Sequence, residues 1–278
     1  MAVVTCKNGD IELEYETFGT SGEPLLLIAP MGNEGRLAYH EDFCAALVDG
    51  GFQVARFDNR DSGLATHVDP KTTYTVRDLA GDAAAVLDAL DWPSAHVFGV
   101  SLGGIIGQTL AVHHADRVRT LTTVATPPSS QWSVCRPKLR TLVKILALGK
   151  PGKGPEGAAD HLIKLFKIVG SPDYPMDEAW IRRIASVYPQ DPAATMRQMA
   201  AMRSAGDRRP ELARITAPTL VIHGGAETML SPHAARETAR VIPGARLVSY
   251  PGMGHDLPRE LWPSMIAELN KLVAGTMV

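Results

Sequence analysis

Apolar residues along the chain fall into two patterns, short continuous runs and longer segments in which they recur every three or four positions. Leu25–Ala29 is a continuous run, too short for a helix and typical of a parallel strand buried on both faces. Val76–Leu90 instead repeats its apolar residues at helical spacing. The same patterns predict helices over Tyr39–Asp49, Leu102–His114, Pro232–Val241 and Leu261–Ala274, and strands over Gln53–Phe57, Ala95–Val100, Thr120–Ala125, Pro218–His223 and Ala245–Tyr250. Buried strands that alternate with helices indicate βαβ units and a parallel sheet.

Two regions depart from this alternation. At the start, the β-rich runs Val3–Lys7 and Glu12–Phe18 flank the turn residues Asn8-Gly9-Asp10 and predict a hairpin. From Pro127-Pro128 to about Arg209 there are only helix-like segments, over Lys138–Leu148, Glu156–Val169, Asp177–Tyr188 and Pro192–Ala205. We therefore predict a core domain of residues 1–127 and 210–278, interrupted by a helical cap of residues 128–209. Such an insertion is typically placed over the carboxyl ends of the strands, where open α/β sheets bind their ligands.

Charge and cysteine content narrow the class of protein. The 28 basic and 30 acidic residues nearly cancel, so the whole-chain charge gives no footprint for nucleic acid or for an anionic membrane. No run reaches the ~18 uncharged apolar residues of a membrane span. The three cysteines, Cys6, Cys44 and Cys135, are far apart and are expected to be free thiols in a reducing compartment. Because the N-terminus also lacks the pattern of a secretory signal, we expect a cytoplasmic protein.

The clearest chemical signal is Gly99-Val100-Ser101-Leu102-Gly103, which lies between a predicted strand and a predicted helix. The G-x-S-x-G pattern can occur by chance in a glycine-rich loop. Between strand and helix, however, it is typical of a nucleophile elbow, in which a tight turn exposes the serine. The free N–H groups and positive dipole of the following helix favour a developing oxyanion. Ser101 is therefore the candidate nucleophile.

A serine hydroxyl needs a base, and the base needs a carboxylate to orient it. Among nine histidines, His255 lies in the loop after the last predicted strand, at the edge of the sheet that the elbow occupies. Glu227 follows the preceding strand, and the order Ser101, Glu227, His255 is that expected of this kind of triad. Asp256 is adjacent to His255 and is expected to point elsewhere. An ordinary surface glutamate remains the alternative interpretation of Glu227.

At this point the chain resembles the α/β-hydrolase family over essentially its whole length, and more closely actinobacterial serine esterases and lipase-like hydrolases of the aclacinomycin methylesterase type. The segments that carry the resemblance are Leu25–Gly32, Phe57–Gly63, Gly99–Gly104, Ala217–Gly224 and Pro251–Pro258. The resemblance implies an α/β-hydrolase fold, with a mostly parallel eight-stranded sheet flanked by helices and a helical cap after the sixth strand. It also implies a serine hydrolase that needs no cofactor and no metal.

The resemblance further assigns roles to individual residues. Ser101 matches the nucleophile and His255 the base, while the N–H groups of Leu102 and Met31 match the oxyanion hole; Pro30 has no N–H and cannot contribute. Asp58 and Arg60 match a loop motif that is structural in the family. The chain departs from the family in having Glu227 where aspartate is usual, and Ala29-Pro30-Met31 where many relatives have His-Gly-x.

The predicted cap is rich in methionine and aromatic residues. Met196, Met199 and Met202 recur every three positions, and this stripe is expected to pack the cap onto the body. The alternative is that some cap residues line an apolar pocket, and Trp132, Trp180 and Met199 are the candidate substrate-binding residues. The basic residues of the first cap helix, Lys138, Arg140 and Lys144, are expected to form a solvated face.

The favoured function is hydrolysis of a small to medium apolar or aromatic carboxylic ester through an acyl-enzyme. A perhydrolase, lactonase or C–C hydrolase of the same fold stays open, because these enzymes share the triad and differ in the pocket. A ligand-binding protein with an impaired triad is the alternative from another class. The expected partner is a small-molecule ester, with no nucleic acid and no membrane span, while the oligomeric state is not predictable.

Overall fold

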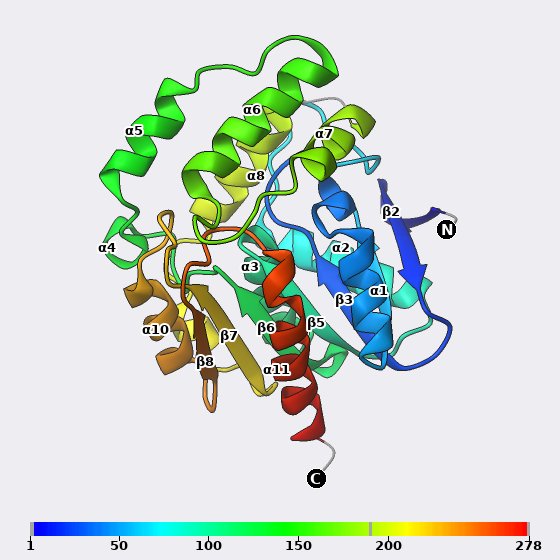
Figure 1. The fold of residues 1–278 in the computed structure, drawn as a ribbon. Helices are drawn as coiled ribbons and strands as arrows, with labels where there is room; N and C mark the ends of the chain where they lie inside the picture. The colour runs from blue at the N-terminus through cyan, green and yellow to red at the C-terminus, as the bar shows by residue number, and fades with distance from the viewer. Residues whose placement is uncertain (1–2, 189–190, 277–278) are drawn as a thin grey trace.

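An eight-stranded sheet with helices on both faces forms the centre of the molecule in the computed structural model, which describes residues 3–188 and 191–276 (Figure 1). The strands are β1 (Val4–Asn8), β2 (Ile11–Phe18), β3 (Glu23–Ile28), β4 (Phe52–Phe57), β5 (Ala95–Val100), β6 (Val118–Val124), β7 (Thr219–Gly224) and β8 (Arg246–Tyr250). The helices that cover the sheet are α1 (Glu41–Asp49), α2 (Val76–Ala89), α3 (Leu102–His113), α10 (Pro232–Val241) and α11 (Trp262–Ala274).

The strand order β1-β2-β4-β3-β5-β6-β7-β8 places the candidate chemistry at one point of the sheet. β1 and β2 form the predicted hairpin, and both β1/β2 and β2/β4 pair antiparallel. The five other pairings are parallel, so the predicted mostly parallel sheet is confirmed. From β3 the chain runs through α1 to β4 on one side and returns through α2 to β5 on the other. The chain therefore changes direction between β3 and β5, and α/β sheets typically bind ligands at the carboxyl ends of the strands at such a point.

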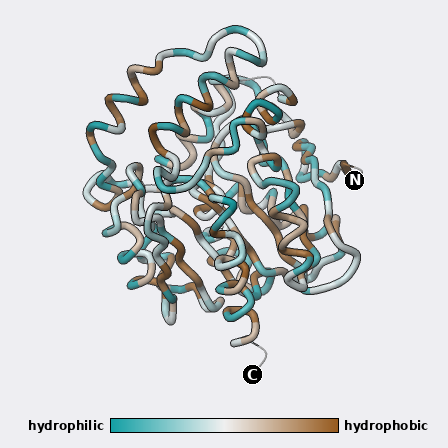
Figure 2. The backbone as a smooth tube through the Cα atoms, in the orientation of Figure 1, coloured by the Kyte–Doolittle hydropathy of each residue, from teal (hydrophilic) through white to brown (hydrophobic). Residues whose placement is uncertain are grey.

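Both faces of the sheet are buried, which is why its central strands are almost wholly apolar. In β3, Leu26 and Ile28 belong to the core under α2 and α3, while Leu25 and Leu27 belong to the core under α1 and α11. Successive side chains of a strand point to opposite faces, so a strand covered on both sides needs an unbroken apolar run. Figure 2 shows apolar residues concentrated along these central strands.

Residues between β6 and β7 form the remaining helices, and the bounds of α5 to α8 are close to those predicted. They are α4 (Trp132–Cys135), α5 (Leu139–Ala147), α6 (Gly154–Val169), α7 (Glu178–Val187), α8 (Pro192–Ser204) and α9 (Arg209–Leu212). Figure 1 shows α5 to α8 gathered at one end of the sheet. The His255 N–H, in the loop after β8, donates to the Val169 carbonyl at the end of α6 at 2.8 Å. This bond identifies that end as the carboxyl end of the strands.

Several small elements were not predicted. α4 and α9 are single turns, and three short 3₁₀ turns occur at Gly35–Ala38, Ala115–Arg117 and Arg259–Leu261. A single turn shows no helical period, so hydrophobic spacing cannot reveal it. Within the described ranges, no helix is both long and apolar enough to cross a membrane.

Candidate active site

Ser101 lies in a strained turn between β5 and α3. Its backbone has φ 54° and ψ −114°, a conformation that costs a non-glycine residue about 1–3 kcal/mol. The two flanking glycines make this turn possible. A Cβ on Gly99 would stand 2.3 Å from the Gly103 carbonyl oxygen, and a Cβ on Gly103 would stand 1.9 Å from the Ile28 carbonyl oxygen. The G-x-S-x-G pattern is therefore required by close packing, and Ser101 is held partly exposed at its apex.

His255 and Glu227 form a direct pair. The two residues come from the loops after β8 and β7, and the His255 Nδ1 to Glu227 Oε2 distance is 2.6 Å. The Glu227 side chain is fully buried, whereas the His255 side chain is 19% exposed. The second oxygen of Glu227, Oε1, accepts the N–H groups of Thr228 and Met229 at 2.7 Å each. Both carboxylate oxygens are thus engaged, as a buried charge requires.

The electrostatics of the pair favour its charged form. Burial alone would lower the pKa of His255, but the charge and hydrogen bond of Glu227, together with the charge of Asp256, outweigh burial and raise this pKa. Burial would raise the pKa of Glu227, yet the charge and hydrogen bond of His255 and the Met229 N–H hold that pKa below its usual value. The two shifts agree, since each group stabilises the charge of the other.

The loop that carries Glu227 is tied to the loop that carries His255. The Ala226 N–H donates to the Met253 carbonyl at 2.9 Å, and the Gly225 N–H donates to the Tyr250 carbonyl at 2.8 Å. A Cβ on Gly224 would stand 2.2 Å from the Met253 carbonyl oxygen, so the two loops run almost in contact. These backbone contacts hold the two loops together at the place where Glu227 binds His255.

Asp256 is not the carboxylate that His255 binds. Its Oδ1 accepts the Ser171 hydroxyl from the loop after α6, and burial raises the pKa of the carboxyl group. The Ser171 Oγ in turn accepts the Gly254 N–H at 2.8 Å. As expected from the sequence, the carboxylate next to His255 points elsewhere, and here it fixes the histidine loop against the end of α6.

Ser101 and His255 stand at the same edge of the sheet without a hydrogen bond between their side chains in the described part of the chain. The Ser101 N–H donates to the Val124 carbonyl of β6, and the Ala125 N–H donates to the Ile222 carbonyl of β7. The carboxyl ends of β5, β6, β7 and β8 are therefore successive neighbours. Hydrogen bonds to a catalytic hydroxyl are commonly long in enzymes without substrate and shorten when the reacting complex forms.

The loop after β3 offers a second backbone donor beside the elbow. Pro30 has no N–H, and the Gly32 N–H already donates to the Gln198 side-chain oxygen at 3.0 Å. Within the described residues the Met31 N–H makes no hydrogen bond, and Met31 is half-buried. Leu102 is the first residue of α3, where a helix leaves its N–H groups free. Met31 and Leu102 thus each offer an amide N–H at this point that makes no hydrogen bond within the described residues.

Helix α8 holds this loop through residues that the sequence did not single out. The Gln198 side chain is 1% exposed; besides accepting the Gly32 N–H, its Nε2 donates to the Asp61 carbonyl at 3.0 Å. Its neighbour Arg197 donates two hydrogen bonds, of 2.7 and 2.8 Å, to the buried Asp61 carboxylate. Asn33 adds a bond of 3.1 Å to Thr195. Polar residues on an amphipathic helix carry no sign of such contacts, because their partners lie far away in the sequence.

The methionine stripe and the candidate substrate residues are placed in different surroundings. The face of α8 that is buried carries Ala194, Gln198 and Ala201, while Met196 is 56% exposed, so the expectation that the whole stripe packs onto the body is wrong at its first member. Met199 is half-buried and Met202 packs against the core. Trp132 is 61% exposed on α4.

The third candidate, Trp180 on α7, lies against the imidazole of His40, with the ring centres 4.2 Å apart. His40 precedes α1, so this contact joins the helices inserted after β6 to the sheet domain. The family loop residues Asp58 and Arg60 make buried ion pairs with Arg36 and Asp82. These pairs agree with the expected structural role of the loop.

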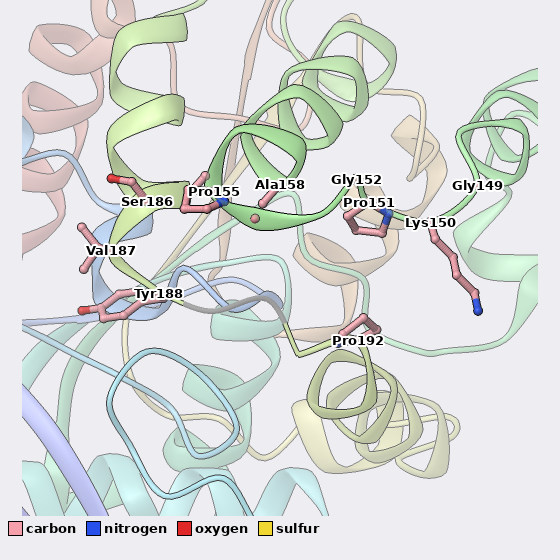
Figure 3. A pocket seen from close by; sticks show the side chains of 12 residues that line it. Gly149, Lys150, Pro151, Gly152, Pro155, Ala158, Ser186, Val187, Tyr188 and Pro192 are labelled. Carbon is pink, nitrogen blue, oxygen red and sulfur yellow. The ribbon is translucent and has the colours of Figure 1, made fainter.

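A pocket of about 830 Å³ lies among the inserted helices, away from the elbow (Figure 3). The loop Gly149–Gly152, the start of α6 and the end of α7 line it, and none of Ser101, His255 or Glu227 does. Among the described residues there is no group of three His, Cys, Asp or Glu side chains arranged to hold a metal ion.

Known proteins resemble the chain over most of its length. A family model described as the alpha/beta hydrolase fold matches residues 24–258. Rhodomycin D methylesterase of Streptomyces peucetius is 31% identical and covers 90% of this chain and 91% of its own. The same enzyme of a second Streptomyces strain is 32% identical, with 90% of each chain covered. The crystal structure of the enol-lactonase from Burkholderia xenovorans superposes with a TM-score of 0.76 at 26% identity, covering 98% of this chain and 100% of that one.

Proposed function

The chain belongs to the α/β-hydrolase fold family and is a hydrolase that acts on ester bonds, and we propose that it works as a serine esterase with Ser101, His255 and Glu227 as its triad. The observation that carries the proposal is the 2.6 Å bond between His255 and the buried Glu227, at the sheet edge where the elbow exposes Ser101. The burial of Glu227 against His255 supports a catalytic role for this glutamate over that of an ordinary surface glutamate.

In the first half of the reaction His255 Nε2 removes the proton of Ser101 while Oγ attacks the ester carbonyl carbon. The Met31 and Leu102 amides stabilise the oxyanion of the tetrahedral intermediate. His255 then donates its proton to the leaving alkoxide, and an alcohol departs from an acyl-serine. Glu227 stays ionised throughout, because its charge stabilises the imidazolium form of His255.

In the second half a water molecule takes the place of the alcohol. His255 removes a proton from it, the hydroxide adds to the acyl carbonyl, and the second tetrahedral intermediate releases a carboxylic acid and restores Ser101. Atoms and charges balance with water as the only co-substrate. The proposed mechanism needs no metal or organic cofactor.

We further propose that the natural substrate is a small to medium apolar or aromatic ester, with a methyl ester as the first candidate. The similarity to two rhodomycin D methylesterases over 90% of the chain supports this proposal. A lactone is a cyclic ester, and the resemblance to an enol-lactonase makes lactones the second class to test. Residues 128–209 would act as the cap over the substrate, and Gln198 as a positioning residue that holds the Met31 amide through Gly32.

The proposal is tested with a fluorophosphonate probe, which labels activated serines, followed by mass mapping of the modified peptide. Wild type should be labelled at Ser101, and Ser101→Ala and His255→Ala should each abolish the label. Ser133→Ala removes an exposed serine of α4 and serves as the matched control that keeps it.

Hydrolysis of p-nitrophenyl acetate, a panel of aromatic methyl esters and a panel of lactones then gives the substrate class. If folded wild type is neither labelled nor active, Glu227→Asp separates the two explanations. Recovery of labelling in that variant would show that the glutamate impairs the triad, and continued silence would support a ligand-binding protein instead.

A further inference from the structure

Helix α5 of the insertion exposes an apolar stripe. Leu139 is 70% exposed, Val143 57% and Leu146 80%, and because they are spaced four and three residues apart they share one helix face. Together with Trp132 they are four of the ten large apolar side chains that are exposed in the described structure. Such clustering within fifteen residues differs from the single exposed apolar residues that any protein carries. The opposite face of α5 rests on the molecule through the buried Thr141.

The same segment is strongly basic. Residues 136–155 contain six lysines and arginines and no acidic residue: Arg136, Lys138, Arg140, Lys144, Lys150 and Lys153. In the described ranges none of these six forms an ion pair, although most other arginines do. Arg140 and Lys144 are four residues apart and flank the apolar stripe. Figure 1 shows α5 at the outer margin of the molecule, and Figure 2 shows apolar and polar residues side by side along it.

The near-neutral charge of the whole chain is the sum of two parts with opposite net charge. Residues 128–209 contain fourteen basic and seven acidic residues, a net charge of +7. The remainder contains fourteen basic and twenty-three acidic residues, a net charge of −9. The expectation that charge offers no footprint for an anionic membrane was drawn from the whole chain, whose average hides two parts of opposite net charge.

We propose that α5 is an interfacial helix, which docks the inserted helices onto an anionic lipid surface with Leu139, Val143 and Leu146 in the acyl boundary and the flanking cations on lipid phosphates. A short helix with a strongly basic side and exposed leucines is the chemistry that such surfaces bind. The long lysine and arginine stems allow their charges to reach the headgroups while the apolar face is buried.

An apolar face can also be covered by a second copy of the chain, but the positive charge of the α5 segment disfavours that arrangement. A two-fold interface places the same patch of each subunit against itself, so the six unpaired cations of one α5 segment would face the six of its partner. Repulsion of this kind disfavours a dimer, whereas an anionic lipid surface neutralises every one of these charges. The proposal is independent of the catalytic triad, because it uses no residue of the elbow or of its partners.

The test is sedimentation of the full-length protein with vesicles of pure phosphatidylcholine or of phosphatidylcholine mixed with phosphatidylglycerol. Binding is expected to the mixed vesicles only, and to weaken as salt is raised, because counterions screen the headgroups. Lys138→Gln, Arg140→Gln and Lys144→Gln combined should weaken binding by about 100-fold, since each basic residue near such a surface contributes about a factor of five. Leu139→Ser, Val143→Ser and Leu146→Ser combined should weaken it by about tenfold or more.

Two matched controls keep the test specific. Lys7→Gln, Lys71→Gln and Lys271→Gln combined remove the same charge from the sheet domain, and Leu64→Ser removes a leucine there that is 57% exposed. Both should bind like wild type, and every variant should keep wild-type hydrolysis of p-nitrophenyl acetate, which verifies the fold. Absence of binding by active wild type would overturn the proposal, as would equal loss in the controls. Light scattering that shows a dimer in wild type and a monomer in Leu146→Ser would assign the face to a second copy instead.

Discussion

Helices α8 and α5 belong to the same insertion and are attached to the molecule in opposite ways. α8 turns polar side chains inward, so that Gln198 and Arg197 bind the loops after β3 and β4 through buried hydrogen bonds. α5 turns Leu139, Val143 and Leu146 outward and leaves its cations unpaired in the described structure. Where polar groups are inside, the helix position is fixed by directional bonds. Where apolar groups are outside, the exposed surface is typical of a site that binds a partner or a membrane.

Removing a bond of α8 should have the largest effect. Arg197→Ala leaves the Asp61 carboxylate buried with its arginine gone, and breaking such a pair costs about 3–5 kcal/mol. Arg140→Ala on α5 removes an exposed, unpaired cation and should change the free energy of unfolding by less than about 0.5 kcal/mol. Urea denaturation of the two variants measures both values. Equal values would mean that α8 is held no more firmly than α5.

The second effect concerns catalysis. Gln198→Met keeps the volume of the side chain but removes its bonds to Gly32 and Asp61, so the Met31 amide loses its support. A displacement of about 1 Å in an active site costs ~10²-fold, and we expect kcat to fall by about 10- to 100-fold with a smaller change in KM. Val143→Ala on α5 should leave both constants for p-nitrophenyl acetate unchanged. A loss in KM alone would indicate that Gln198 shapes the pocket and does not position the loop.

The third effect is a shift in the pH dependence of kcat/KM. Only neutral His255 can act as base, so kcat/KM should rise with pH through the pKa of His255, which Glu227 holds above its ordinary value of about 6.5. Glu227→Gln removes the charge that raises this pKa, so the acidic limb should move to lower pH while the maximal rate drops. Lys144→Gln on α5 should leave the limb in place, because exposed distant charges are screened. A pH–rate profile of the three proteins checks the shift, and a limb unmoved in Glu227→Gln would contradict the pairing.

The smallest effect is expected on the outer face of α5 itself. Leu146→Ser exposes no new surface and leaves no cavity, so the free energy of unfolding should change by less than about 0.5 kcal/mol. Ile184→Ser, on the buried face of α7, should cost several times more, because it buries a hydroxyl and opens a cavity. Thermal unfolding of both variants makes the comparison. A large loss in Leu146→Ser would show that the stripe is packed in solution, for example against another copy.

What the sequence could predict followed from local regularity. The strand runs and helical periods predicted the succession of strands and helices along the chain, because burial on both faces leaves an unbroken apolar run in β3 and its neighbours. The elbow could also be predicted from a local pattern. Gly99 and Gly103 must be glycines, because a Cβ at either position would collide with backbone atoms. The deflection of Asp256 away from His255 was also anticipated, and Ser171 supplies its partner.

What the sequence could not predict depends on contacts between distant segments. Gln198 and Gly32 are 166 residues apart, and nothing in a polar helix position indicates a buried partner at that distance. The prediction that the methionine stripe of α8 packs onto the body was wrong at Met196, because the helix buries the face that carries small and polar residues instead. The cations of α5 were expected to be solvated, and they are exposed. The exposure of Leu139 and Leu146 could not be predicted from helical spacing, because it depends on which face of α5 packs against the rest of the molecule.

The separation of charge between the two parts of the chain affects how the molecule rotates as it approaches a charged surface. A body with +7 at one end and −9 at the other has a large dipole moment, although its net charge is only −2. Near a negatively charged plane the field exerts a torque on that dipole within about a Debye length, roughly 10 Å at ordinary salt. The molecule would therefore rotate as it diffuses and arrive with the inserted helices leading. Orientation would precede adsorption, and the end that carries the carboxyl edge of the sheet would face the plane from the first encounter.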